Sequence, residues 1–302
     1  MMINGNGMPI ARKDSMMTIS QLSKRLDSIL CDIPDREFDK MCIMEDLCGV
    51  TREMLAVHSD KELSEAAVNS AVKGARRRAA GYPLQYILGS WEFYGRPFKV
   101  GEGVLIPRPD TETLIDEIIA RLGRETNAGI IDLCSGSGCI AVTLAKELPE
   151  SRVYAVELSA EAFPYLVENV RMNSADVKLL KGDIMNGALM ENFRTEDGEY
   201  LTVDCIVSNP PYLTDKEMDE LQKEVTFEPE MALYGGNDGL KYYRVITCLW
   251  KELLKKGGMM IFETGTEQAV AVSQILTDSG FTDIFTANDA TGGVRVVGGF
   301  LR

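Results

Sequence analysis

The stretch "IIDLCSGSGCIAVTLA" (residues 130–145) decides how this chain folds. It begins with an apolar run, which favours a short buried strand. Gly136 and Gly138 follow, and glycine adopts backbone conformations that other residues avoid, so a tight turn is expected there. The pattern from 138 to 148 then predicts a helix. Strand, glycine turn and helix in this order are typical of the first unit of an open α/β sheet.

The alternation of strand and helix continues to the C-terminus. Short apolar runs predict seven strands, at 129–133, 153–157, 177–180, 203–208, 259–263, 281–286 and 294–298. Amphipathic segments predict helices at 111–122, 138–148, 160–172, 240–255 and 266–279. This order predicts a parallel, doubly wound α/β sheet. No helical pattern separates the last two runs, so the final strand is expected to enter antiparallel, as a hairpin.

The N-terminal part of the chain has a different pattern. Residues 18–84 show helical periodicity and predict a small domain of four or five helices. Residues 85–107 are rich in aromatic residues, glycine and proline, and predict a β-hairpin connector that turns at Gly95. The large domain is then expected to span 108–302. Residues 1–17 lack the apolar segment of a secretory signal and are expected to form a flexible leader.

Composition and charge argue against several functions. The chain has 302 residues and a net charge of −14. A protein that binds nucleic acid mainly through the phosphates requires clustered basic residues, so the charge argues against such a partner. No apolar run reaches the roughly 18 residues that indicate a membrane span. The seven cysteines form no Cys-x-x-Cys pair, and His58 is the single histidine. No metal site is therefore expected, and the thiols are expected to be reduced, as in the cytoplasm.

Three ligand-binding positions follow three successive predicted strands, where the crevice of such a sheet lies. The glycine loop 134–138 allows close approach of a ligand. Glu157 ends the second strand about 20 residues later, where an acid can accept both ribose hydroxyls of an adenosine. Asp183 follows the third strand and can reach an adenine amino group. The alternatives are a tight turn without a ligand and an exposed Glu157 that caps the next helix. Together the three positions predict an adenosine-type cofactor.

The glycine loop also bears on which cofactor binds. Its sequence, Cys134-Ser135-Gly136-Ser137-Gly138, lacks the Gly-x-Gly-x-x-Gly spacing of dinucleotide enzymes. Asp132 adds negative charge just before the loop, which disfavours a pyrophosphate and favours a sulfonium or an ammonium group. S-adenosylmethionine is therefore predicted in preference to NAD.

A rigid corner follows the fourth predicted strand, in "VDCIVSNPPYLTD" (203–215). The side-chain oxygen of Asn209 and the backbone carbonyl of Pro210 can accept the two hydrogens of an amide or amino NH₂ group. The prolines fix these acceptors, and Tyr212 offers a flat face to a planar group. Such anchoring directs a weakly nucleophilic nitrogen at a methyl sulfonium. The alternative is a turn that only ends the strand.

These motifs resemble those of the amino-group methyltransferases, which act on adenine or cytosine in DNA, or on glutamine amides in proteins. Three further segments resemble the release-factor glutamine methyltransferases, the HemK/PrmC family. They are "QYILGSWEFYGRPFKVGEGVLIPRPDTE" (85–112), "EPEMALYGGNDGLKYYR" (228–244) and "ETGTEQ" (263–268). The resemblance covers nearly the whole chain from about residue 18. It implies a Rossmann-like, seven-stranded class I methyltransferase domain and a small N-terminal helical domain, joined by a β-hairpin.

The resemblance implies methyl transfer from S-adenosylmethionine to the side-chain amide nitrogen (N5) of the glutamine in the Gly-Gly-Gln motif of class I peptide-chain release factors. Asn209, Pro210 and Tyr212 would be catalytic, and Pro211 and Leu105 would join them in binding the substrate. The cofactor would be bound by Cys134, Ser135, Gly136, Ser137, Gly138, Glu157, Asp183, Ile184 and Asn209. A cytoplasmic monomer is expected, with the release factor as its partner and without direct contact to nucleic acid or membrane.

The sequence departs from the family pattern at three positions. Cys134 and Ser135 stand where the family usually has Gly-Thr, and if the first position requires a positive φ, Cys134 is strained. Glu157 replaces the usual Asp, and Asp110 replaces the usual Glu. Two alternative functions stay open at this point. A DNA adenine-N6 or cytosine-N4 methyltransferase predicts a target-recognition insertion and a basic face. A non-catalytic S-adenosylmethionine-binding adaptor predicts that Asn209 can be changed without loss of function.

Overall fold

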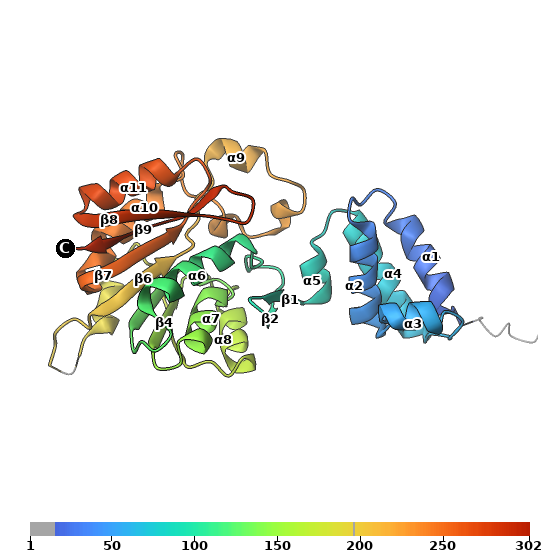
Figure 1. The fold of residues 1–302 in the computed structure, drawn as a ribbon. Coiled ribbons are helices and arrows are strands. Elements are labelled where there is room, and N and C mark those ends of the chain that lie inside the picture. The colour runs from blue at the N-terminus through green and yellow to red at the C-terminus, as the bar shows by residue number, and fades with distance from the viewer. Residues whose placement is uncertain (1–15, 196) are drawn as a thin grey trace, which may run out of the picture. The chain divides into compact units, whose positions relative to one another are not determined.

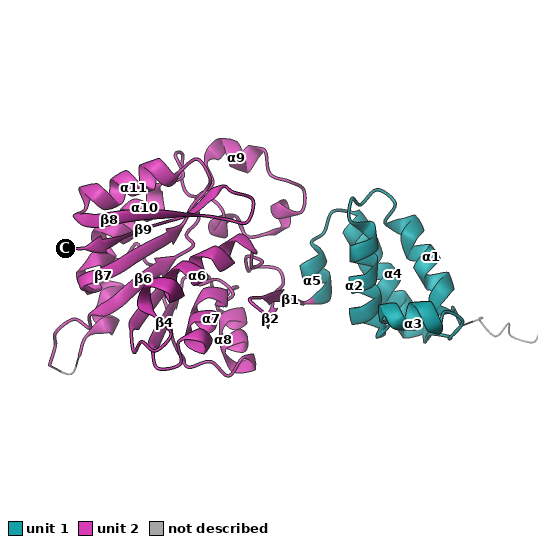
Figure 2. Cartoon of the chain, in the orientation of Figure 1, with its two compact units in different colours: residues 1–88 teal, residues 89–302 magenta. Residues whose placement is uncertain are grey.

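The structure is a computed structural model that describes residues 16–195 and 197–302. The chain forms two compact units, with a boundary between Leu88 and Gly89 (Figure 2). Most of the expected leader, residues 1–15, lies outside the described residues. The carbonyl of Met17 accepts a hydrogen bond from the N–H of Leu63 (3.0 Å). Within the described ranges, none of the helices has both the length and the apolar character that a bilayer span requires.

The first unit is helical. Thr18 begins its first helix with a capping box, in which its side chain accepts from the N–H of Gln21 and the Gln21 side chain accepts in return. The described part of the unit contains α1 (Ile19–Ile29), α2 (Arg36–Cys48), α3 (Arg52–Val57), α4 (Glu65–Ala79) and α5 (Leu84–Leu88). Arg78 and Asp39 form a buried ion pair (2.5 Å) between α4 and α2.

The second unit contains a seven-stranded sheet in the order β5-β4-β3-β6-β7-β9-β8 (Figure 1). Its strands are β3 (Gly129–Leu133), β4 (Arg152–Glu157), β5 (Val177–Lys181), β6 (Val203–Ser208), β7 (Leu254–Glu263), β8 (Phe281–Asn288) and β9 (Val294–Leu301). The first five are parallel, and β9 runs antiparallel to both β7 and β8. The doubly wound sheet and its antiparallel end are therefore confirmed.

Helices cover both faces of this sheet, because successive strand residues point to opposite sides. In β3, Ile130 packs in one core and Ile131 in the other. The first core is covered by α6 (Asp110–Leu122), α7 (Cys139–Glu147) and α8 (Phe163–Met172). The second core is covered by α10 (Lys241–Leu249), α11 (Ala269–Asp278) and the 3₁₀ helices Gly187–Phe193 and Trp250–Leu253. The short elements α9 (Asp215–Asp219), Val225–Phe227 and Glu230–Ala232 follow β6.

A β-hairpin of β1 (Ser90–Phe93) and β2 (Arg96–Lys99) packs on α8. Tyr94 and Gly95 form its two-residue turn with φ of 51° and 69°, as a type I′ turn requires. The buried Asn169 of α8 accepts from the N–H of Lys99 (2.6 Å) and donates to the carbonyls of Lys99 (3.0 Å) and Ser137 (2.8 Å). This amide therefore ties the hairpin to the glycine loop.

One predicted helix boundary was wrong. The helix expected at 240–255 ends at Leu249, continues as a 3₁₀ turn, and gives way to β7 at Leu254. The pairing of β7 with β6 shifts register between the Val203–Leu254 and Cys205–Met259 pairs. Residues 255–258 occupy this irregularity, and Gly257 adopts a φ of 75°. Trp250 and Leu253 are thus buried on the 3₁₀ helix and Leu254 at the strand start, rather than on one longer helix face.

Candidate functional site

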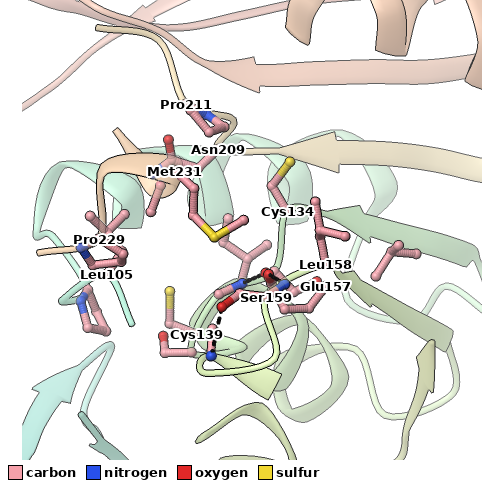
Figure 3. Close-up of a pocket in the computed structure, with 18 of the residues that line it drawn as sticks. Leu105, Cys134, Cys139, Glu157, Leu158, Ser159, Asn209, Pro211, Pro229 and Met231 are labelled. Carbon is pink, nitrogen blue, oxygen red and sulfur yellow. Dashed lines mark hydrogen bonds between the residues drawn. The ribbon is translucent and has the colours of Figure 1, made fainter. Parts of the chain in front are cut away.

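The carboxyl ends of β3, β4 and β6 open into one pocket, as expected for the ligand crevice of a doubly wound sheet. Figure 3 shows Leu105 and Pro229 on one side of it and Glu157 and Leu158 on the other. Of the predicted site residues, the pocket lining includes Leu105, Cys134, Ser135, Gly136, Ser137, Glu157, Asp183, Ile184, Asn209 and Pro211. Gly138, Pro210 and Tyr212 are not in the lining.

The glycine loop has three residues with positive φ: Cys134 (61°), Gly136 (53°) and Gly138 (81°). A Cβ on Gly138 would lie 2.4 Å from Cδ1 of Leu166, so this glycine is required by packing against α8. A Cβ on Gly136 would meet nothing within 4 Å, and Gly136 faces the pocket. Cys134 does adopt the left-handed conformation, which strains a residue that carries a Cβ.

Glu157 is buried beneath this loop. Its Oε2 accepts a hydrogen bond from the N–H of Gly136 (2.7 Å), and its Oε1 accepts one from the N–H of Ser159 (2.6 Å). Burial raises the pKa of the carboxyl group, and these backbone N–H groups oppose the rise. The alternative of an exposed helix cap is wrong, because the Glu157 side chain is buried and α8 begins at Phe163 without a side-chain cap. Ser159 accepts from the N–H of Ala162 (3.1 Å) in the turn before that helix. Glu157 thus lies at the pocket wall with acceptor capacity left on both oxygens.

The third strand supplies a more apolar wall. Asp183 Oδ1 accepts from the N–H of Met185 (2.8 Å), which fixes the turn after β5. Ile184 is buried, and its carbonyl accepts a hydrogen bond from the indole of Trp250 (3.0 Å). Tyr242 of α10 joins these residues in the pocket lining. An apolar wall beside one carboxylate suits a flat heterocycle with an amino group.

Asp132 lies on β3 and is fully buried, outside the pocket lining. Its carboxyl oxygens have no hydrogen-bond partner in the part of the chain that the structure describes. Burial raises its pKa to about 8, and the Ser135 side chain and the Ala141 N–H oppose this rise without forming a hydrogen bond of normal geometry to the carboxyl oxygens. Such an uncompensated carboxyl group favours a nearby cation over an anion.

The corner after β6 is held from several sides. Asn209 and Pro211 line the pocket, and the side-chain amide of Asn209 donates to Oγ1 of Thr111 (3.4 Å). The carbonyl of Tyr212 accepts from the side chain of Gln268 (2.8 Å), while the Tyr212 ring packs against the second core. Gly239 lies close to the same carbonyl, since a Cβ there would be 2.2 Å from its oxygen. These contacts add to the rigidity that the two prolines give the corner.

A buried carboxylate joins two further walls of the pocket. Glu228 Oε2 accepts from the N–H of Ile106 (3.0 Å), and its Oε1 pairs with Arg108. This connects the segment that contains Leu105 to the segment that contains Pro229 and Met231. The sequence did not predict several of the residues that line the pocket. Among them are Thr111, Cys139, Leu158, Pro229, Met231 and Tyr242. Their one sequence signal was that four of them lie in or beside the segments 85–112 and 228–244.

The comparisons with known proteins agree with this architecture. The model of the PrmC N-terminal domain matches residues 18–89, and that of the methyltransferase small domain matches residues 110–233. The release factor glutamine methyltransferase of Geobacter sulfurreducens is 41% identical over 252 residues, which cover 83% of this chain and 84% of that protein. The chain belongs to the release factor glutamine methyltransferase family. The relative from Thermodesulfovibrio yellowstonii is 35% identical over 91% of this chain and 97% of its own length.

Solved structures agree with the class I methyltransferase fold of this family member. The hMettl16 catalytic domain, solved in complex with the MAT2A 3'UTR hairpin 6, has a TM-score of 0.54. It is 17% identical and covers 76% of this chain and 81% of its own, so the likeness concerns the fold alone.

The pocket of this family member fits S-adenosylmethionine. The space beside Gly136 admits a ligand close to the backbone, and the buried Glu157 carboxylate suits a ribose. Arg108 is the one cationic side chain in the described lining, and it is already paired with Glu228. A pyrophosphate would therefore lack a counter-charge. Among the described residues, no cluster of three His, Cys, Asp or Glu side chains is suited to a metal ion.

Proposed function

We propose that this protein transfers a methyl group from S-adenosylmethionine to the side-chain amide nitrogen of the glutamine in the Gly-Gly-Gln motif of class I peptide-chain release factors. The observation that carries the proposal is that one pocket contains both the glycine loop and Asn209. The family membership of the chain supports the same activity. Glu157, Asp183, Ile184 and the loop 134–138 would hold the cofactor, which supplies an electrophilic methyl group.

The Asn209 corner would orient the glutamine. An amide nitrogen is a weak nucleophile because its lone pair is delocalised, so its position and orientation contribute much of the rate. Asn209 Oδ1 accepts no hydrogen bond from the described residues, and neither does the carbonyl of Pro210. Both acceptors are therefore available for the two hydrogens of the substrate NH₂ group. The methylated nitrogen is strongly acidic and loses its proton to water, so a general base is not required.

The pocket walls would admit a slender side chain. Leu105, Pro211, Pro229 and Met231 supply apolar surface around Asn209, and Met231 is 48% exposed. We propose that Leu105 and Pro211 contact the aliphatic part of the glutamine. Tyr212 would both support the corner and contribute to substrate binding.

The net charge of −14 favours a protein substrate over DNA, which would require a basic face. We further propose a monomer that acts in the cytoplasm, where release factors meet the ribosome.

Isotope transfer from labelled S-adenosylmethionine tests the proposal. The full chain is incubated with a class I release factor, with the same factor carrying Gln→Ala in its Gly-Gly-Gln motif, or with DNA. We expect label in the first sample only. Label in DNA but not in the release factor would refute the proposal in favour of the DNA methyltransferase alternative.

Asn209→Ala separates catalysis from cofactor binding. It should reduce methyl transfer at least 100-fold while the affinity for S-adenosylmethionine stays within a few-fold, because a positioning contact is lost. Asn192→Ala is the matched control, since Asn192 is an exposed residue of the 3₁₀ helix Gly187–Phe193. Turnover by Asn209→Ala at the control rate would contradict the anchoring role of Asn209, whereas cofactor binding without any methyl transfer by the wild-type chain would favour the adaptor alternative.

A further inference from the structure

Thr111, Glu263 and Asn209 form a buried chain of polar groups beside the pocket. Thr111 lies in the first turn of α6 and Glu263 at the end of β7, and both are almost inaccessible to solvent (1% and 2% exposed). The Thr111 hydroxyl donates to Glu263 Oε2 (2.5 Å). The Asn209 amide donates to the same hydroxyl oxygen (3.4 Å). The three groups come from distant parts of the chain, so the fold itself brings them together.

The direction of these hydrogen bonds determines which end of the Asn209 amide faces the pocket. An ionised carboxylate can only accept hydrogen bonds, so the Thr111 hydroxyl must donate its one hydrogen to Glu263. Its oxygen is then an acceptor, which selects the NH₂ end of Asn209. The Oδ1 end is left for the substrate amide, which needs an acceptor there.

We propose that Thr111 and Glu263 are positioning residues that hold the Asn209 amide with its oxygen toward the substrate. This inference rests on the proposed function, because it assigns to Asn209 the anchoring of a substrate NH₂ group. Neither residue touches the reacting atoms. Each residue acts by setting which group donates and which accepts along the chain of hydrogen bonds.

Protonation of Glu263 reverses that polarity. Burial raises the pKa of Glu263 to about 7 and Asp110 adds to the rise, whereas the Thr111 hydroxyl, Arg295 and the Asn209 side chain oppose it. A protonated carboxyl group can donate to Thr111, whose hydroxyl can then donate to Asn209 Oδ1 and turn the NH₂ end toward the substrate. The active orientation of the Asn209 amide is therefore present above about pH 7 and is lost as the pH falls below that value. The other charged or titratable groups that act on Glu263 are those of Asp110, Arg295, Tyr212, Tyr243 and Cys139.

The test measures kcat, KM and their pH profiles with the full chain and a class I release factor. At pH 8, Thr111→Val should lower kcat roughly 10- to 100-fold, because the amide loses its fixed orientation. Glu263→Gln should lower it as well and abolish the decline near pH 7. Thr111→Ser should recover most of the activity that Thr111→Val loses. The affinity for S-adenosylmethionine should change less than threefold in all three variants.

Thr247→Val is the matched control, since Thr247 is also fully buried but its hydroxyl has no partner among the described residues. Wild-type kcat in Thr111→Val, equal losses in the Ser and Val variants, or an unchanged acid decline in Glu263→Gln would overturn the proposal. If the wild-type protein methylates DNA instead, the proposed function fails, and the same variants test the positioning role with that substrate.

A measurement without substrate covers the case in which no methyl transfer is found. The side-chain NH₂ signals of Asn209, assigned by comparison with Asn209→Ala, are followed by NMR as the pH is varied. They should shift near pH 7 in the wild-type protein and in Thr247→Val, but not in Glu263→Gln. A shift that persists in Glu263→Gln, or none in the wild type, would refute the link to Glu263.

Discussion

The carboxylate of Glu228 accepts a hydrogen bond from the backbone N–H of Ile106 at 3.0 Å, although 122 residues separate them in the sequence. Both groups are buried, and the second oxygen of Glu228 pairs with Arg108. Leu105 lies just before Ile106, and Pro229 just after Glu228, so this one side chain fixes the spacing of two pocket walls.

Glu228→Ala should loosen this part of the pocket. It leaves the buried N–H of Ile106 without an acceptor, which costs about 1–3 kcal/mol of unfolding free energy. We expect a lower Tm and a KM for the release factor raised several-fold, with a smaller effect of Glu228→Gln, which keeps an acceptor. Thermal unfolding and steady-state kinetics measure both. The exposed Glu220→Ala serves as control, and equal values for Glu220→Ala and Glu228→Ala would contradict the bracing role.

The two glycines of the loop should respond differently to alanine. Gly138→Ala places a Cβ 2.4 Å from Leu166 at a φ of 81°, so overpacking adds to strain, and a loss of roughly 2–4 kcal/mol is expected. Gly136→Ala meets no neighbour and adds about 1 kcal/mol of strain, but its methyl group enters the ligand space. Denaturant unfolding should therefore rank Gly138→Ala as less stable, whereas calorimetry should show weaker cofactor binding by Gly136→Ala. The reverse stability order would refute this division.

Cys134 offers a test of backbone strain at the cofactor loop. Its φ of 61° favours glycine, so Cys134→Gly should be more stable than Cys134→Ala by about 1 kcal/mol, although glycine is normally the less stable of the two. Both variants lack the thiol, and their difference therefore isolates the backbone. Equal or greater stability of the alanine variant in denaturant unfolding would show that the loop tolerates a Cβ without strain.

The fold could be predicted from local patterns because each strand and helix carries its own signal. The run at 129–133 is apolar except for Asp132, and β3 is indeed buried on both faces. The helix at 240–255 was predicted too long, because the register shift of β7 against β6 depends on pairing partners 51 and 54 residues away and leaves no local signal in the sequence.

Local patterns predicted the site only where its residues follow strands, and Leu105 was added by the family resemblance. Asn209 and Glu157 stand directly at strand ends, which share one edge of the sheet. Thr111 and Glu263 lie 152 residues apart, and their contact depends on how α6 packs against the sheet. The same holds for Glu228. Such side chains become recognisable as a group only in the folded protein.

The buried carboxyl of Asp132 should make stability depend on pH. Its pKa rises from 3.8 to about 8 on folding, mainly through burial, so the folded state binds a proton that the unfolded state has released. Stability is therefore greatest below about pH 4 for this group and falls as pH rises to about 8. Each unit within this window removes up to about 1.4 kcal/mol.

Asp132→Asn removes this single titration. Its unfolding free energy relative to the wild type should increase from pH 5 to pH 8 and then level off, because the amide does not ionise. Denaturant unfolding at several pH values measures the difference, with the exposed Asp219→Asn as control. A difference that stays constant across this range, as expected for the control, would show that Asp132 is ionised in the folded protein. Saturating S-adenosylmethionine should shrink the pH dependence, since a nearby cation lowers the pKa of the carboxyl group.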